Sequence, residues 1–389
     1  MKYLLAFLFL QMPLYCCTDF QLTAEDKSEV VGRSMEFALN LHSEVVLHPQ
    51  GEKYSITLPN ASSNPTQGLS WTSKYGYLAV NAFGLDLPVD GMNEKGLSFG
   101  ALWFPGAEYE KVPAGKESQA LLLTNIGNWL LGNFATVDEA RAGLEKVYLF
   151  AEPIAEFGNS IPPCHISLHD ATGKSIVIEF IKGEKVISDN PVRILTNAPY
   201  FEWHVVNLSN YINLNAMNAG PVKIGNTVID GTGQGSGFLG IPGDWTPPSR
   251  FVRIAAYKQF AKRAKNSTDA TILALHLLNT VDIPLGDVQE KNNTSDYTQW
   301  VVIKDLTNKN FYVRSYEDPN LYQIDMNKLN LAPNVPQARM VIPTTTKFVN
   351  ATTSMIPVEV KPPEAAGMGV IPPTVPNATP PATPITNFR

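Results

Sequence analysis

The sequence predicts an α+β fold for residues 17–330, and two observations support this prediction. Short segments rich in β-branched and aromatic residues are bounded by turn residues, as in antiparallel strands. Stretches with apolar residues at helical spacing interrupt these strands. Hairpins and helices that come in blocks, without strict alternation, indicate helices layered on antiparallel sheets. No internal repeat and no convincing domain boundary appears within 17–330.

Residues 1–16 have the pattern of an export signal peptide. A positive charge precedes an apolar run over residues 4–10, and this run is too short to span a bilayer. Cleavage after Cys16 would leave Cys17 as the first residue of the mature chain. A buried N-terminal strand or helix is an alternative, and so is a lipid-anchored cysteine, although Tyr15 or Cys16 would then occupy a position that normally needs a small residue. No later apolar run is long enough to span a bilayer, so no stable membrane insertion is expected.

Turn residues predict two hairpins. The first spans residues 45–58 around Pro49-Gln50-Gly51, and the second spans 165–180 around the turn at 170–174. Further strands are expected at 301–303 and 310–314.

Apolar spacing and capping residues predict helices in two parts of the chain. Thr136 can cap one of them, because its hydroxyl can accept a hydrogen bond from the first turn and Glu139 follows three residues later. The expected helical ranges are 120–131, 136 to about 148, 248–264 and 266–278.

The composition changes over residues 331–389. Twelve of the 30 prolines fall there, with abundant Thr and Ala and few charges. Proline removes a backbone donor and disfavours helices and central strands, so a disordered Pro/Thr-rich tail is predicted. A spacer, a glycosylated stalk, a wall-contacting segment and an unselected terminus all fit this composition.

Charge and motif content exclude several classes of function. Thirty Lys and Arg face 36 Asp and Glu, so no basic excess is available to neutralise phosphates, and a nucleic-acid partner is not expected. The chain has neither a phosphate-binding loop, nor a G-x-S-x-G elbow, nor an H-E-x-x-H zinc motif. Three cysteines cannot form a disulfide framework. Cys164 and His165 are neighbours in a predicted strand and point to opposite faces, so they cannot act as a pair, and Cys164 is expected to be buried.

Cys17 is the residue on which the chemistry would depend. Exposed as a new N-terminus, it carries its own base, because a free α-amino group titrates near a pKa of about 8. That amine can take the thiol proton directly or through water, so no catalytic histidine is required. A nearby positive charge would lower the thiol pKa, and Arg33 is the candidate.

Five blocks occur in an order that points to one family. They are Cys17–Asp19, Gly32–Phe37, Asp90–Leu97, Leu195–His204 and Gly233–Phe251. One block alone is a weak signal, but together they resemble the choloylglycine hydrolase family, which contains the bile salt hydrolases and penicillin V acylases. The resemblance implies a four-layer αββα sandwich, the N-terminal nucleophile (Ntn) hydrolase fold, and hydrolysis of a non-peptide amide bond.

The resemblance also implies roles for individual residues. Cys17 resembles the nucleophile, with its amine as the base, and Arg33 resembles the arginine beside the thiol. Asn197 resembles the side-chain donor to the oxyanion, and Arg250 resembles the arginine that supports the network. A fixed donor to an oxyanion lowers the barrier by roughly 3–4 kcal/mol. This chemistry implies no metal and no organic cofactor.

Two positions depart from the family pattern. Glu36 stands where the family usually has the Asp that orients the α-amine, so its carboxylate reaches one methylene further. Trp103 stands where relatives have Asn or Tyr, and its backbone N–H would serve the oxyanion while its indole lines the cleft. Simpler interpretations exist for other residues: Arg33 and Glu36 could form a plain ion pair, and Asn197 could be a turn residue.

The leading hypothesis is an exported amidase that forms an acyl-thioester on Cys17. Its partner would be a small N-acyl amide, and a homo-oligomer is expected because relatives are often tetramers. Penicillin V or an N-acyl homoserine lactone is favoured over a conjugated bile salt, since export and the residues around Trp203 and Trp245 read closer to penicillin V acylases. The alternative is a non-catalytic surface or wall-associated protein that keeps the fold. Candidate cleft residues, each of which could equally be core, are Trp71, Phe83, Trp103 and Phe104.

Overall fold

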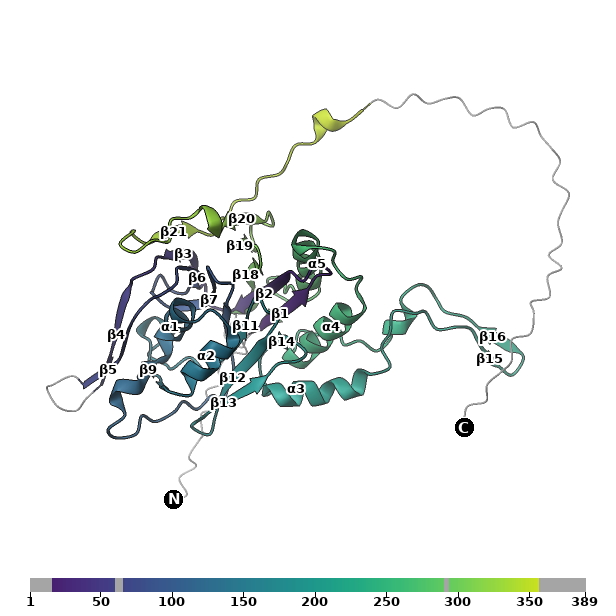
Figure 1. Ribbon diagram of the computed structural model, residues 1–389. Helices are drawn as coiled ribbons and strands as arrows, with labels where there is room; N and C mark the ends of the chain where they lie inside the picture. Colours follow the sequence, from purple (N-terminus) through teal and green to yellow (C-terminus); the bar gives the residue numbers. More distant parts are fainter. Residues whose placement is uncertain (1–15, 60–65, 290–293, 357–389) are drawn as a thin grey trace, which may run out of the picture. The chain divides into compact units, whose positions relative to one another are not determined.

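The computed structural model describes residues 16–59, 66–289 and 294–356 (Figure 1). The predicted leader lies outside these residues except for Cys16, and so does the tail beyond residue 356. The chain divides into two compact units, Met1–Lys347 and Phe348–Arg389. The first unit contains the sheets and helices that surround Cys17.

The first antiparallel sheet contains the strand that begins at Cys17. Its order is β14 (Ile194–Leu195), β1 (Cys17–Thr23), β2 (Glu29–Phe37), β18 (Ser295–Asp305), β19 (Asn310–Ser315) and β20 (Tyr322–Asp325), with β17 (Val288–Gln289) paired to β18. Every residue of β2 is buried. A strand buried on both faces must be covered by a layer on each side.

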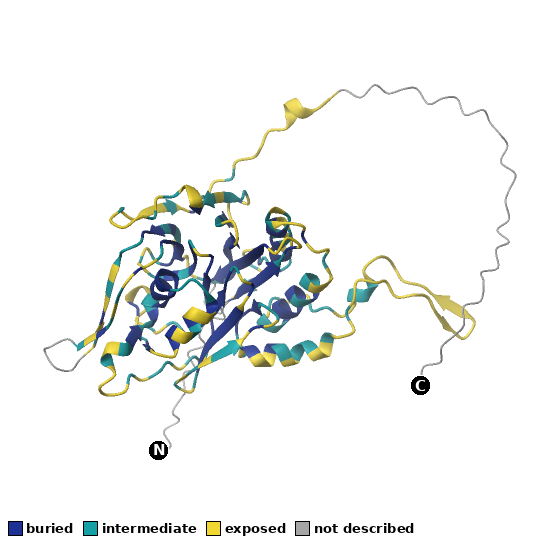
Figure 2. Cartoon of the chain, viewed as in Figure 1, coloured by how far each residue is buried: buried dark blue, intermediate teal, exposed yellow. Residues whose placement is uncertain are grey.

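The second sheet lies against the first. Its order is β13 (Glu184–Asp189), β12 (Ser175–Ile181), β11 (Cys164–His169), β8 (Ser98–Trp103), β7 (Pro88–Asn93), β6 (Tyr77–Asn81), β3 (Glu44–His48) and β21 (Ala338–Val341). The strands β1 and β8 contact each other across the two sheets. Figure 2 shows that the buried residues concentrate in these two sheets.

Helices cover the outer face of each sheet. α4 (Pro247–Phe260) and α5 (Ser267–Asn279) pack on β1 and β2, whereas α1 (Ile126–Asn133) packs on β7 and β8. α2 (Val137–Leu144) buries Val137, Ala140 and Leu144 in the same apolar cluster as α1. The layer order is helix, sheet, sheet, helix, which confirms the predicted α+β fold and its four-layer αββα sandwich.

The remaining elements are short. Two ribbons and a parallel pair complete the strands: β4 (Lys53–Leu58) with β5 (Thr66–Thr72), β15 (Val222–Ile224) with β16 (Thr227–Ile229), and β9 (Ala120–Leu122) with β10 (Tyr148–Phe150). α3 (Phe201–Asn207) precedes the β15–β16 hairpin. Single 3₁₀ turns lie at Glu117–Gln119, Leu123–Asn125, Ala155–Phe157, Leu208–Tyr211, Ser236–Phe238, Met326–Lys328 and Thr352–Ser354.

Several local predictions are confirmed. The hairpin predicted at 165–180 is the antiparallel pair of β11 and β12. The Thr136 side chain caps α2 by accepting a hydrogen bond from the backbone N–H of Glu139, and Asn266 caps α5 in the same way. The strands predicted at 301–303 and 310–314 lie within β18 and β19.

Other local predictions are wrong because long-range pairing overrides the local pattern. The expected hairpin over 45–58 does not form: β3 pairs with β6 and β21, while β4 pairs with β5. The helix expected over 120–131 begins only at Ile126, because Ala120–Leu122 instead form the strand β9. The predicted tail starts too early, since β21 joins the second sheet and Ile342 is buried.

None of the helices among the described residues is both long and apolar enough to cross a membrane.

Candidate active site

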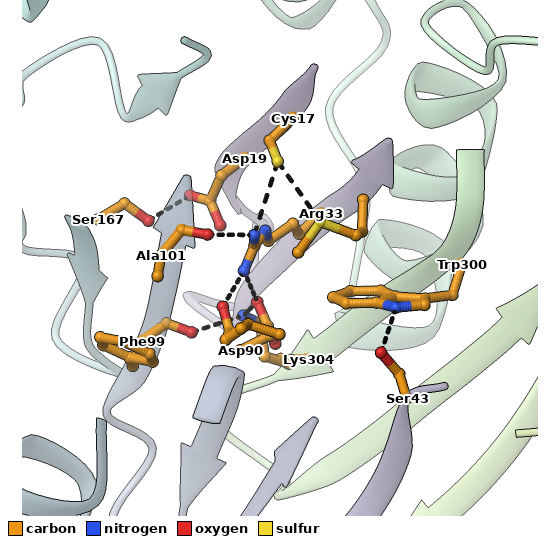
Figure 3. A network of polar contacts seen from close by, with 12 residues as sticks. Cys17, Asp19, Arg33, Ser43, Asp90, Phe99, Ala101, Ser167, Trp300 and Lys304 are labelled. Carbon is orange, nitrogen blue, oxygen red and sulfur yellow. Dashed lines mark hydrogen bonds and ion pairs between the residues drawn. The ribbon is translucent and has the colours of Figure 1, made fainter. Parts of the chain in front are cut away.

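Strand alternation places the side chains of Cys17 and Arg33 on the same face of the first sheet. Cys17 on β1 lies directly opposite Met35 on β2, and Asp19 lies opposite Arg33. Opposed residues of an antiparallel pair share a face, and so do residues two apart along one strand. The thiol and the guanidinium therefore enter the space between the two sheets together, as Figure 3 shows.

A pocket with an empty volume of about 760 Å³ opens beside the Cys17 thiol. Aromatic rings form part of its wall, and the ring of Phe157 lies 5.6 Å from Trp103, 6.2 Å from Phe37 and 6.4 Å from Phe83 between centroids. Most of the other lining side chains are also apolar. A pocket with this apolar lining suits a hydrophobic acyl group.

The Cys17 thiol is buried beside a cation. Its Sγ lies 3.8 Å from Nη2 of Arg33 and 3.6 Å from Sδ of Met35. Burial raises the pKa of the Cys17 thiol, whereas Arg33 and a hydrogen bond from the backbone N–H of Trp103 lower it. Because burial dominates, the thiol is mainly protonated near neutral pH, and nucleophilic attack requires a base that accepts its proton.

Asn197 and Arg250 hold the start of β1. Oδ1 of Asn197 accepts hydrogen bonds from the backbone N–H of Cys17 at 2.7 Å and from Nη2 of Arg250 at 2.6 Å. Nδ2 of Asn197 donates to the carbonyl of Trp103 at 2.9 Å, and an amide nitrogen carries a second N–H for another acceptor. Arg250 also donates to the Cys17 carbonyl and to the hydroxyl of Thr18 at 2.7 Å.

Glu36 lies on the opposite face of β2 from Arg33, because the two are separated by three positions in a strand. Its carboxylate accepts a hydrogen bond from Oγ1 of Thr298 at 2.8 Å. Arg33 pairs with Asp90 at 3.1 Å, so the simple Arg33–Glu36 ion pair is wrong. Burial raises the pKa of Glu36 to about 7, against the lowering effect of Arg250.

The structure divides the predicted cleft residues into two groups. Phe83 and Trp103 both line the pocket beside Cys17. Trp71 instead stacks on a tyrosine of β4 at 4.9 Å, and Phe104 stacks on the ring of His165 at 4.8 Å. Neither Trp71 nor Phe104 belongs to the pocket lining, so the prediction is wrong for these two residues.

The buried histidines of β11 have partners outside the pocket lining. His165 lies between the Glu179 carboxylate at 3.1 Å and a backbone carbonyl at 2.8 Å, and His169 contacts the Asp19 carboxylate. These contacts give both histidines a structural role. Cys164 is partly exposed and lines the pocket, contrary to the burial expected for it.

The structure adds Asp90 and Lys304 to the residues around Cys17. Nζ of Lys304 lies 2.9 Å and 2.8 Å from the two carboxylate oxygens of Asp90. Asp90 opens one of the family-like blocks, and Lys304 follows an apolar strand segment. A lysine at an inward-facing strand position indicates a buried partner, and that signal was available in the sequence.

Across residues 16–59, 66–289 and 294–356, no group of three or more His, Cys, Asp or Glu side chains is arranged to hold a metal ion.

Comparison with known proteins identifies one family. The family model described as linear amide C-N hydrolases, choloylglycine hydrolase family, matches residues 17–342. A bile salt hydrolase/transferase of Clostridium perfringens is 34% identical over 324 residues, which cover 82% of this chain and 94% of that protein. A penicillin V acylase of Pectobacterium atrosepticum is 28% identical and covers 78% of each chain.

Solved structures of similar proteins have the same architecture. A variant of conjugated bile acid hydrolase from Clostridium perfringens superimposes with a TM-score of 0.74 at 31% identity, covering 86% of this chain and 99% of that one. Penicillin V acylase from Agrobacterium tumefaciens superimposes with a TM-score of 0.67 at 26% identity, covering 84% and 91%.

Proposed function

Because this chain belongs to the choloylglycine hydrolase family of linear amide C-N hydrolases, we propose that it is an exported amidase with Cys17 as its N-terminal nucleophile. The observation that carries this proposal is the position of the Cys17 thiol. It lies 3.8 Å from Nη2 of Arg33 and forms part of the wall of an apolar pocket. The backbone nitrogen of the same residue, which becomes the α-amine after cleavage, lies 2.7 Å from Oδ1 of Asn197.

The proposed reaction proceeds through an acyl-thioester. The α-amine of Cys17 takes the thiol proton, and Sγ attacks the amide carbonyl of the substrate. The tetrahedral oxyanion is stabilised by the second N–H of Asn197 Nδ2 and by the backbone N–H of Trp103. The intermediate collapses, and the C–N bond breaks while the leaving amine takes a proton from the α-ammonium. Water, deprotonated by the α-amine, then hydrolyses the thioester and releases the acid.

The substrate that we propose is an N-acyl amide with a hydrophobic acyl group, such as penicillin V or a long-chain N-acyl homoserine lactone. The apolar lining beside Cys17 favours phenoxyacetyl or alkyl groups over groups that need polar partners. A conjugated bile salt is the competing substrate, and similarity to a bile salt hydrolase/transferase supports testing it.

The function is tested by incubating the purified mature protein with penicillin V, glycocholate and a long-chain N-acyl homoserine lactone. Hydrolysis of at least one amide, abolished by Cys17→Ser, is expected. Absence of hydrolysis with all three, or undiminished hydrolysis by Cys17→Ser, contradicts the proposal. A kcat/KM that favours glycocholate overturns the substrate preference and leaves the amidase function standing.

Export and cleavage after Cys16 are part of the same proposal. The short apolar run after a positive residue supports a leader over residues 1–16, and the family match begins at Cys17. N-terminal sequencing of the secreted protein is expected to begin at Cys17. A chain that retains its leader has no free α-amine at this position and contradicts the mechanism.

We also propose that the chain forms a homo-oligomer through the β15–β16 hairpin. Four apolar side chains on this hairpin are at least half exposed: Val222 (59%), Ile224 (68%), Val228 (64%) and Ile229 (51%). Figure 2 colours the whole hairpin as exposed. Clustered exposed apolar residues favour a protein interface. Analytical ultracentrifugation is expected to report a tetramer that dissociates on Val222→Asp and Ile229→Asp. A monomeric wild-type protein contradicts this.

A further inference from the structure

A network of buried charges lies between the two sheets beside Cys17 (Figure 3). Arg33 on β2, Asp90 on β7 and Lys304 on β18 each have no exposed surface. These residues come from both sheets, so the network forms only when the sandwich is assembled. Charges without access to water are rare unless they are paired and hydrogen-bonded, so the arrangement of these three carries information.

Asp90 holds two cations at once. Its two oxygens accept hydrogen bonds from Nζ of Lys304 at 2.9 Å and 2.8 Å, and Oδ2 lies 3.1 Å from Nη1 of Arg33. Lys304 therefore faces the carboxylate with both oxygens in reach, whereas Arg33 reaches one of them. The three groups together carry a net charge of +1.

The contacts of Arg33 fix the orientation of its planar guanidinium. Nη1 donates to Asp90 and to the carbonyl of Val89, while Nη2 donates to the carbonyl of Ala101 and lies 3.8 Å from Sγ of Cys17. Because the guanidinium is flat, anchoring Nη1 directs Nη2 toward the sulfur. The ring of Trp300 lies 5.6 Å from Cζ of Arg33 and adds a cation–π contact.

A glycine leaves room for this arrangement. A Cβ at Gly100 on β8 would lie 3.3 Å from Nη1 of Arg33 and 3.3 Å from Oγ of Ser167. Asp19, the other buried carboxylate on this face, accepts hydrogen bonds from Ser167 and contacts His169. Asp19 thus has its own partners, and Asp90 is the carboxylate that contacts Arg33 directly.

We propose that the Asp90–Lys304 pair positions the Arg33 guanidinium against Cys17 and leaves its positive charge available to the thiolate. Lys304 neutralises Asp90, so the carboxylate anchors Arg33 without cancelling it. Asp90 and Lys304 are positioning residues that act through Arg33, since neither hydrogen-bonds to Cys17 or lines the pocket. This inference rests on the proposed function only in taking Cys17 as the nucleophile.

Other charged or titratable groups also act on Cys17 and must stay unchanged in the test. Burial raises the pKa of the Cys17 thiol, and Arg33 opposes this. Besides the tested pair, Arg33 and Glu36 on β2 and Cys164 on β11 interact electrostatically with the thiol, and Arg250 on α4 donates to the Cys17 carbonyl. Asp19 on β1, which contacts His169 on β11, acts through Arg33.

Removing Lys304 and removing Asp90 are expected to shift the pKa of the Cys17 thiol in opposite directions, so the two single variants together test the proposal. Lys304→Met leaves Asp90 to cancel Arg33, so the measured pKa of the Cys17 thiol is expected to rise by about one unit. Asp90→Asn leaves two cations beside the thiol, so that pKa is expected to fall by a similar amount. The double variant Asp90→Asn/Lys304→Met keeps the net charge, so its thiol pKa stays within about half a unit of wild type.

The thiol pKa is obtained from the rate at which iodoacetamide alkylates Cys17 in the folded protein at a series of pH values. Mass spectrometry of the peptide that contains Cys17 measures the extent of alkylation. This readout needs no turnover, so it separates the inference from the proposed amidase function. A wild-type protein that hydrolyses no amide, together with the expected opposite pKa shifts in the variants, contradicts the amidase function and supports the positioning role. The kcat of the double variant on a hydrolysed amide is expected to fall about tenfold with KM little changed, because Arg33 loses its anchor.

A matched control is the Glu110–Lys185 pair, whose charged atoms lie 3.2 Å apart and which is also largely buried. Glu110→Gln/Lys185→Met removes the same kinds of charge and is expected to leave the Cys17 thiol pKa and kcat unchanged. Shifts of the same sign in both single variants, or an unshifted thiol pKa in both, overturn the proposal. If a single variant does not fold, the charge-balanced double variant Asp90→Asn/Lys304→Met tests the proposal by itself. A wild-type kcat in the double variant also overturns the proposal.

Discussion

Oδ1 of Asn197 lies 2.7 Å from the backbone nitrogen of Cys17, although the two residues are 180 positions apart in the chain. The same oxygen accepts a hydrogen bond from Arg250, which identifies it as the acceptor end of the amide. The donor end, Nδ2, therefore faces the Trp103 side, where the substrate oxyanion would form. In the proposed mechanism, this one side chain would orient the α-amine of Cys17 and offer a donor to the transition state.

Asn197→Ala is expected to lower kcat by about 10²–10³ with a smaller change in KM, because one donor to the oxyanion is lost. Steady-state kinetics on the best amide substrate measures this. Asn190→Ala is the matched control, since Asn190 is also buried but its side chain hydrogen-bonds to the backbone of Ile194, away from Cys17. Equal losses of activity in both variants would contradict the assigned role of Asn197.

Glu36→Gln is expected to change how stability depends on pH. Burial raises the pKa of Glu36 from 4.5 to about 7, so the folded protein holds this proton more tightly than the unfolded chain. Stability therefore falls as pH rises from about 4.5 to 7, by at most about 3 kcal/mol, and stays lowered above that range. Because glutamine does not ionise, Glu36→Gln is expected to lack this fall in stability.

Urea unfolding at pH 5 and pH 8 measures the effect of Glu36→Gln, with the exposed Glu25→Gln as control. The difference in unfolding free energy between the two pH values is expected to shrink in Glu36→Gln and to remain in Glu25→Gln. A wild-type pH dependence in Glu36→Gln would show that this carboxyl is ionised at its ordinary pKa.

Phe157→Ala is expected to change substrate selection more than turnover. Its ring touches those of Phe37, Phe83 and Trp103 and forms part of the pocket wall. Removing it should raise KM for a phenoxyacetyl substrate about tenfold, because apolar contact area is lost. Trp71→Ala, which removes an aromatic ring outside the pocket, should leave KM unchanged. A kcat loss without a KM change in Phe157→Ala would argue against a role in binding.

Gly91→Ala is expected to destabilise the protein by about 1–3 kcal/mol. An added Cβ would lie 2.6 Å from the carbonyl oxygen of Leu78 and 2.6 Å from Cδ1 of Leu131, so β6 or α1 would have to move. The thermal midpoint measures this change, and Gly220→Ala is the control because nothing lies within 4 Å of the Cβ that it adds. An unchanged thermal midpoint in Gly91→Ala would mean that Leu78 and Leu131 move aside without loss of stability.

Local signals in the sequence were enough to predict several elements. The turn at Asp170–Lys174 predicted the β11–β12 hairpin, and Thr136 marked the start of a helix, because turns and caps depend on neighbouring residues. The position of β3 could not be predicted in this way. It pairs with β6 and β21, and its partner residues lie far along the chain.

In the site, too, single residues could be predicted from the sequence, whereas their contacts could not. Cys17 was singled out by its position after the predicted leader, and Arg33, Asn197 and Arg250 were singled out by family-like blocks. Their contacts depend on which face of each strand meets the other sheet. The Asp90–Lys304 pair joins residues 214 positions apart. The strand position of Lys304 indicates a buried partner, but no local pattern identifies that partner as Asp90. Trp71 failed as a cleft residue because an aromatic in a strand can face either side, and Phe104 failed because it lies just beyond β8 and stacks on His165.

The most direct test of the central claim is to trap the acyl-enzyme. The mature protein is mixed with a slowly hydrolysed N-acyl amide, quenched in acid within the first turnover and digested for tandem mass spectrometry. The expected product is a peptide that begins at Cys17 with a free α-amine and carries the acyl mass on Sγ. An acyl group on another residue, or a protein that turns over substrate while Cys17 remains preceded by Cys16, would contradict it.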